Sequence, residues 1–182
     1  MDQNNANNFN PSGFVDNAIR RLNRRTEQNL PDKAFRAVMR RAANPNMESA
    51  AWEYMIPFCD ITVERNRKAF ALVGAAIAAE APETDGIASI GRALRSICNN
   101  EDDIDREKRR FRRLLSCDTT VELVGVLNPM MHYIQENAQV GLSYKKLLWD
   151  LLCWEQGEKV KINWTTDFFL KPFTTEEENR QS

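Results

Sequence analysis

The residues with the clearest chemical potential are arginines, concentrated in segment 103–116, which reads DIDREKRRFRRLLS. From Arg106 to Arg113 there are six basic residues against one acidic residue, Glu107. At helical spacing, the apolar side chains share one stripe and the arginines lie on the other faces. The expected buried stripe consists of Ile104, Phe111, Leu114 and Leu115. A guanidinium presents a planar fork of donors that fits a phosphate, so this face could follow a phosphate backbone. A solvated helix face, partly paired with nearby acids, explains the same pattern.

A second basic group lies in segment 33–41, KAFRAVMRR. Arg36 and Arg40 are one helical turn apart, and Arg41 follows directly. An exposed amphipathic helix and a phosphate site are both consistent with this group. The two groups together favour phosphate binding, because both would otherwise be accidental.

Catalysis and metal binding find little support. His132 is the only histidine and has no nucleophile motif beside it. The acids of segment 101–105 could hold a divalent cation, as in a metal-dependent nuclease, but their consecutive placement favours a helix start. No glycine-rich phosphate loop is present. The four cysteines are far apart and are expected to be reduced thiols: Cys59, Cys98, Cys117 and Cys153. The sequence therefore predicts no enzyme, no metal and no cofactor.

The elements that must position these arginines are expected to be helices. With 182 residues, 42% hydrophobic and 28% charged, a globular fold is favoured over disorder. No segment alternates as a strand would, so we predict an all-α fold. The predicted helices cover residues 14–25, 31–44, 48–56, 62–80, 89–97, 103–116, 120–135, 143–153 and 158–170.

Breaks in the helical pattern suggest a division of the chain. We expect a disordered tail at 1–12, an N-terminal helical lobe at 13–80, a linker at 81–87, a C-terminal helical lobe at 88–171 and an acidic tail at 172–182. Neither a secretory signal nor a membrane span is visible, so a cytoplasmic protein is expected.

Several segments, in order, carry a family resemblance. These are DGIASIGRAL at 85–94, KRRFRRLL at 108–115, LSYKKLLWDLLCW at 142–154 and VKINWTTDFF at 160–169. Upstream, AVMRR at 37–41 and an aromatic run ending in Pro57-Phe58 also match. Together they resemble the small subunit of the type I-E CRISPR surveillance complex Cascade, the CasB family, over residues 33–171.

The resemblance implies an all-helical, two-lobed, non-catalytic protein. Two copies would lie beside the guide RNA and other Cascade subunits and help to hold the target and displaced DNA strands. The candidate nucleic-acid-binding residues are Arg36, Arg40, Arg41, Arg65, Arg67, Arg92, Arg109, Arg110, Arg112, Arg113 and Lys146.

Some of these residues have a structural alternative. Arg92 could pack or pair within its motif, and Lys146 could pair with Asp150 one turn later. The motif aromatics are expected to be core rather than base-stacking platforms: Tyr144, Trp149, Trp154, Trp164 and Phe168. For the whole chain, the alternative is a helical homodimeric adaptor or regulator that binds acidic protein partners.

Overall fold

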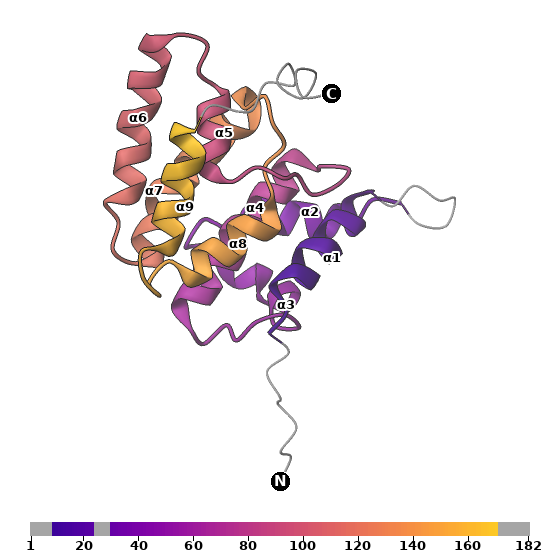
Figure 1. Ribbon diagram of the computed structural model, residues 1–182. Coiled ribbons are helices and arrows are strands. Elements are labelled where there is room, and N and C mark those ends of the chain that lie inside the picture. Colours follow the sequence, from indigo (N-terminus) through magenta and orange to yellow (C-terminus); the bar gives the residue numbers. More distant parts are fainter. Residues whose placement is uncertain (1–8, 24–29, 171–182) are drawn as a thin grey trace, which may run out of the picture.

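The computed structural model describes residues 9–23 and 30–170, and in these ranges the protein is all-α, as predicted (Figure 1). One isolated bridge, between Ala88 and Leu142, is the sole β-type pairing in the described ranges. The helices are α1 (Pro11–Asn23), α2 (Lys33–Met39), the 3-10 helix η1 (Glu48–Ala51), α3 (Trp52–Met55), α4 (Glu64–Glu80), α5 (Ile90–Ser96), α6 (Glu101–Leu115), α7 (Thr120–Asn137), α8 (Tyr144–Cys153) and α9 (Lys159–Phe169).

Side-chain caps explain where five of the helices that follow α1 begin. In each, an oxygen of the residue before the helix accepts a hydrogen bond from a backbone N–H of the first turn. At α7 the cap is reciprocal, because the Glu122 carboxylate also accepts from the Thr119 N–H. The capping residues are Asp32, Ser89, Asn100, Thr119 and Ser143.

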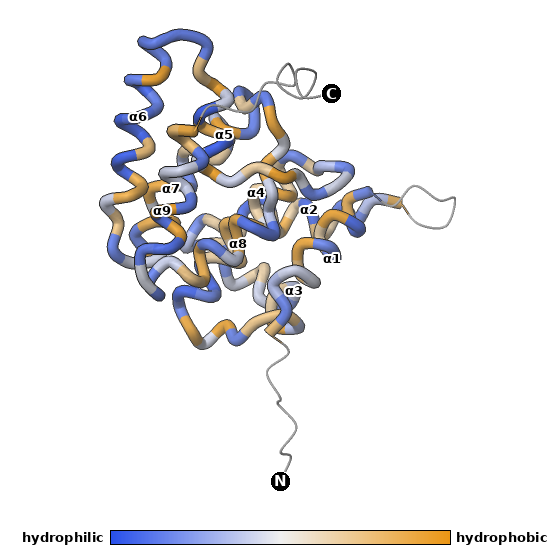
Figure 2. Tube along the Cα trace, in the orientation of Figure 1, coloured by the Kyte–Doolittle hydropathy of each residue, from blue (hydrophilic) through white to orange (hydrophobic). Residues whose placement is uncertain are grey.

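Helix α4 forms the centre of the molecule. All its residues from Ala69 to Ala78 are buried, and the helix packs against α1, α2, α7 and α8. Its small side chains let neighbouring helices approach closely. A Cβ at Gly74 would lie 2.1 Å from the Met39 methyl group, so a side chain here would require the buried Met39 to move. Figure 2 shows the contrast with α6 at the edge of the molecule, which is mostly hydrophilic.

The predicted linker at 81–87 is anchored to the start of α8. The Gly86 N–H donates to the Leu142 carbonyl (3.2 Å), and the Ser143 N–H donates to the Ala88 carbonyl (2.9 Å). The Asp85 carboxylate accepts from the Tyr144 N–H at 2.6 Å. Buried residues on both sides of this segment belong to one continuous core. At its other end, the Pro82 carbonyl accepts from the Asn23 side chain at 2.5 Å. The segment between the two predicted lobes is therefore held at both ends, and the division into lobes stays a prediction.

Helices α5 and α9 cross at very short range. A Cβ at Gly91 would lie 2.0 Å from the Trp164 carbonyl oxygen. Glycine is therefore required at this position by the backbone of the opposite helix. The contact sets the position of α9, which in turn supports α6.

Several predicted boundaries were wrong. Helix α1 begins at Pro11, inside the predicted tail, because the Asn10 side chain accepts from the Gly13 N–H (2.8 Å) and proline suits the first helical position. The single helix expected at 48–56 is split into η1 and α3. Val63, inside the helix predicted at 62–80, precedes α4 and is exposed. The remainder of the N-terminal tail (1–8) and the acidic tail (172–182) lie outside the described residues.

Candidate nucleic-acid interface

The basic helix α6 is fixed to the body of the protein by its apolar side. Phe111 and Leu114 are buried, and the Phe111 ring stacks on Phe168 of α9 with centroids 4.7 Å apart. Ile104 and Leu115 are only half-buried, so the predicted stripe is narrower than expected. The first turn carries Glu101, Asp102 and Asp103, where negative charge complements the helix dipole.

A buried carboxylate on α6 was not expected from the sequence. Glu107 has no exposed surface, and its Oε1 accepts hydrogen bonds from the Tyr133 hydroxyl (2.7 Å) and from Arg110. The Arg110 guanidinium also lies over the Tyr133 ring, 4.2 Å from its centroid. Arg106 contacts Asp103 and lies 3.6 Å from the same Glu107 oxygen. Arg110, a predicted phosphate ligand, is thus held in a structural cluster.

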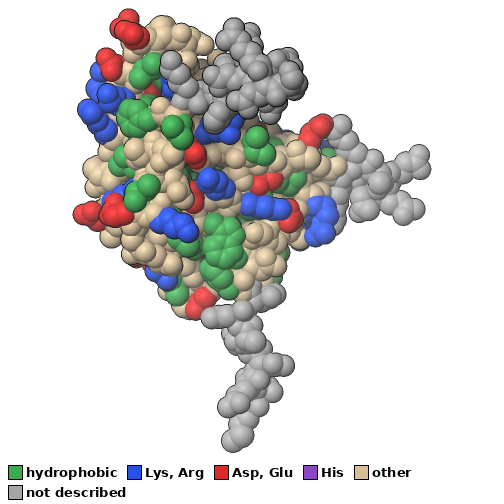
Figure 3. Space-filling view, viewed as in Figure 1, with side chains coloured by type: hydrophobic (Ala, Val, Ile, Leu, Met, Phe, Trp, Pro, Cys, Tyr) green, Lys and Arg blue, Asp and Glu red, His purple; other side chains and the backbone are tan. Residues whose placement is uncertain are grey.

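The remaining α6 arginines make up the α6 face, which consists of Arg109, Arg112 and Arg113. All three are exposed and form no ion pair within the described part of the chain. Their spacing of three and four residues places Arg112 and Arg113 one turn from Arg109. Figure 3 shows Lys and Arg side chains gathered along this edge of the molecule. Three exposed charges on one rigid helix could bind successive phosphates.

A second exposed basic group lies at the end of α2. Arg36, Arg40 and Arg41 are all exposed. The Arg36 Nε donates to the Ala78 carbonyl at 3.1 Å, which ties that side chain to α4. Helix α2 packs on α1 and α4, whereas α6 packs on α5 and α7, so the two basic groups lie on different parts of the fold.

Arg65 and Arg67 do not extend this exposed surface. Arg67 donates from Nε to the buried carboxylate of Glu48 (2.5 Å) and from Nη1 to the Ile61 carbonyl (2.9 Å). Lys68 binds the other Glu48 oxygen at 2.5 Å. Arg65 is half-buried, with an Nε that has no hydrogen-bond partner in the described residues. The ion pair weighs against a phosphate role for Arg67.

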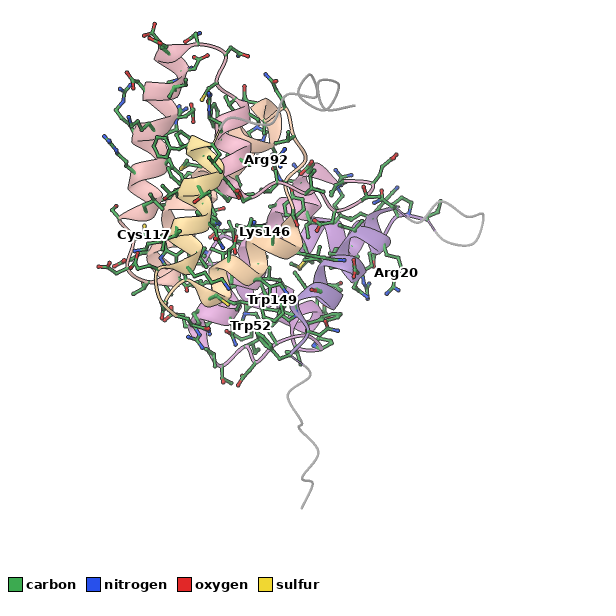
Figure 4. All side chains as sticks on the ribbon, viewed as in Figure 1. Arg20, Trp52, Arg92, Cys117, Lys146 and Trp149 are labelled. Carbon is green, nitrogen blue, oxygen red and sulfur yellow. The ribbon has the colours of Figure 1, made fainter. Side chains whose placement is uncertain are left out.

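Arg92 and Lys146 lie on a third surface, formed by α5 and α8 (Figure 4). Arg92 is exposed. The Lys146 Nζ lies 3.7 Å from Asp167, whose carboxylate accepts from the Ser89 hydroxyl at 2.5 Å. The alternative pairing of Lys146 with Asp150 does not form an ion pair here: the Asp150 carboxylate accepts from the Trp164 indole N–H (2.6 Å), and the Lys146 charge acts on it from farther away. Burial raises the pKa of the Asp150 carboxyl.

Residues considered for catalysis are dispersed. His132 is exposed and lies 3.1 Å from Glu136 on the same helix. Asp103 is used at the helix start, where it accepts from the Asn99 N–H (3.1 Å) and from Arg106. Within residues 9–23 and 30–170, no three His, Cys, Asp or Glu side chains are grouped as metal ligands would be. Cys59 and Cys117 are buried, and burial raises the pKa of the Cys59 thiol to about 12.

Comparison with protein families gives the chain its identity. The family model for CRISPR-associated protein Cse2 matches residues 35–169. The chain belongs to the Cse2 family. This match confirms the resemblance drawn from the sequence motifs, and every candidate binding residue from Arg36 to Lys146 lies inside the matched range.

Solved Cse2-type structures share this fold. CasB from Thermus thermophilus is 24% identical and has a TM-score of 0.64, with 88% of this chain and 98% of that chain covered. A second structure from the same species is of a CRISPR-associated protein of the Cse2 family. It is 23% identical and has a TM-score of 0.64, with 87% of this chain and 97% of that chain covered. CasB from M. ruber is 22% identical and has a TM-score of 0.59, with 94% of this chain and 97% of that chain covered. A comparison with curated proteins finds no match. In the described residues of this Cse2 protein, no helix has the length and apolar character needed to cross a membrane.

Proposed function

We propose that this Cse2 protein is the non-catalytic small subunit of a type I-E Cascade complex, in which it holds nucleic acid by its phosphate backbone. In this role it stabilises the pairing of guide RNA with target DNA and the displaced strand of the R-loop. The observation that carries the proposal is the α6 face. Its three arginines are exposed on a helix fixed by buried aromatic contacts, and no acid in the described residues neutralises them.

The chemistry of this face suits binding without sequence reading. Guanidinium groups on a rigid helix contact phosphate oxygens, which are the same for every sequence. Sequence recognition then belongs to base pairing with the guide RNA, while the protein supplies electrostatic stabilisation. Arg40 and Arg41 on α2 provide a second exposed group for another strand or another segment of the same strand.

The partners in this proposal are the other Cascade subunits, the guide RNA, both DNA strands and a second copy of the chain. Family membership supports association with CRISPR components. No catalytic step is assigned: of the residues considered for catalysis, Asp103 accepts hydrogen bonds at the start of α6, and His132 lies beside Glu136 on the surface.

The proposal is tested by purifying the tagged chain from its native host under conditions in which the CRISPR genes are expressed. We expect a large particle that contains other protein subunits and a short RNA of uniform length. A variant with charge reversals at Arg109 and Arg113 should still enter the particle but capture target DNA less well at moderate salt. A lone monomer or dimer without RNA would instead support the adaptor that binds acidic proteins.

A further inference from the structure

Of the five motif aromatics expected in the core, one lies on the surface. Trp149 of α8 is 43% exposed, although the motif aromatics were expected in the core. The other four of that set are buried, with exposures of 2% or less: Tyr144, Trp154, Trp164 and Phe168. Among these five aromatics, the prediction of a core position was therefore wrong for Trp149 alone. An exposed aromatic side chain of this size can mark a binding surface.

The Trp149 ring is held in place rather than merely exposed. Its Nε1–H donates to the Ser12 hydroxyl at 3.2 Å, and the Phe9 ring lies edge-on at 6.0 Å between centroids. Both contacts come from the start of α1. The only polar atom of the indole is thus satisfied, and the surface that remains is the aromatic ring itself.

Two lysines lie one helical turn from this ring. Lys145 and Lys146 precede Trp149 by four and three residues, so all three lie on the outer side of α8. Lys145 is paired with Asp16 at 2.6 Å, whereas Lys146 makes only the longer contact with Asp167. Ser89, which binds the same Asp167 oxygen, caps α5 one turn before Arg92.

The views of this face agree with that arrangement. Figure 4 shows Arg92, Lys146 and Trp149 following one another from α5 down along α8. In the same orientation, Figure 3 shows an exposed hydrophobic patch with Lys and Arg side chains above it.

We propose that Trp149, with Lys146 and Arg92, forms a base-stacking site for single-stranded nucleic acid, separate from the α6 face. A base stacks on the exposed indole, and the neighbouring phosphates contact the two cations. This inference rests on the proposed function, which it deepens by adding contact with a base to contacts with phosphates.

Single-stranded nucleic acid fits this face better than a protein partner does. Every base has a flat aromatic surface, and stacking on an indole requires no hydrogen bond from it. Lys146, one turn from the ring, and Arg92, farther along the same face, match the phosphates of a strand whose base stacks on Trp149. An apolar protein partner would instead have to bury the charges of Lys146 and Arg92, and the ion pair of Lys146 with Asp167 is long, at 3.7 Å.

The test measures the affinity of the full-length protein for two strands of equal length at low salt. One is an oligothymidine strand, and the other is an abasic strand that carries the same phosphates without bases. Trp149→Ala should weaken binding of oligothymidine by about fivefold to 100-fold and leave binding of the abasic strand unchanged. Trp149→Phe, which keeps a ring, should restore most of the loss. Trp52→Ala is the matched control, because Trp52 is also exposed (37%) but lies on α3.

The outcomes separate this inference from the proposed function. Replacing the α6 face arginines by glutamine should weaken binding of both strands to the same extent. If this replacement leaves both affinities unchanged, the phosphate role of α6 is overturned and the stacking site is not affected. Equal weakening of both strands by Trp149→Ala, or no weakening of oligothymidine, overturns the stacking site. Reduced self-association in sedimentation with unchanged strand binding identifies a protein interface and also overturns it. A wild-type protein that binds neither strand overturns both proposals.

Discussion

The sharpest prediction concerns the salt dependence of binding through the α6 face. We expect the triple variant Arg109→Gln, Arg112→Gln, Arg113→Gln to bind single strands with a smaller dependence on salt than the wild type. Each phosphate contact releases condensed counterions and contributes about 0.7 to the slope of log K against log salt for a single strand. Three contacts therefore contribute about 2 to the slope. Glutamine keeps a good helix propensity, so the fold of α6 should persist.

The size of the effect can be stated in affinity. Between about 50 and 200 mM salt, a slope difference of about 2 corresponds to about 20-fold. Wild type should thus lose about 20-fold more affinity than the triple variant over this range. Fluorescence anisotropy with a labelled strand, repeated at several salt concentrations, measures both slopes.

A matched control comes from the same helix. Arg106 has a side chain that is 49% exposed, but it is already engaged by Asp103 and lies near Glu107. Arg106→Gln should therefore leave the slope close to that of wild type. An unchanged slope in the triple variant, or an equal change in Arg106→Gln, would refute the reasoning that exposed, unpaired arginines carry the phosphate contacts.

Three further predictions concern stability. Gly91→Ala should lower the free energy of unfolding by about 1–3 kcal/mol, because its Cβ would meet the Trp164 carbonyl oxygen at 2.0 Å. Gly125→Ala has open space around its Cβ and should instead raise the free energy of unfolding by about 0.5–1 kcal/mol. Thermal melts in which Gly91→Ala is the more stable of the two would contradict this. Glu48→Gln should cost about 2 kcal/mol in urea unfolding, since it leaves two half-buried cations without their carboxylate; an unchanged midpoint would show that the pairs contribute nothing. Backbone N–H donors at the start of α7 lower the pKa of Glu122 below its usual 4.5, so its ionised form favours the folded state above about pH 4.5 and that gain is lost as pH falls through the lowered pKa. Glu122→Gln should therefore melt below wild type at about pH 7, and the gap should close in acid.

The sequence was sufficient to predict the helical fold because the signals are local. Apolar spacing marks the buried sides, and residues such as Ser89, Thr119 and Ser143 stand at helix starts where their caps form. The boundaries that failed depend on contacts outside the segment. Asn10 extends α1 and is held by the Phe58 carbonyl, a contact that no local pattern reveals.

The candidate site was predicted less completely, because exposure and pairing depend on tertiary structure. Glu107 occupies the apolar stripe between Ile104 and Phe111, so its position was visible in the periodicity. Its burial was missed because a carboxylate is ordinarily assigned to the solvent side. Arg67 and Glu48 are 19 residues apart, and Trp149 is far from the α1 residues that hold it. Such long-range contacts decide which arginines and aromatics remain available for ligands.

The anchoring of segment 81–87 has a mechanical consequence. Bending the chain there would have to separate α4 from α7 and α8, which pack against it in one continuous core. Packed interiors resist such deformation, so we expect segment 81–87 to hold its shape rather than act as a hinge. When the proposed Cascade complex changes shape, we expect this subunit to move as one rigid body. In the proposed function, the distance between its α2 and α6 arginines would then be constant and would set the spacing of the strands that they contact.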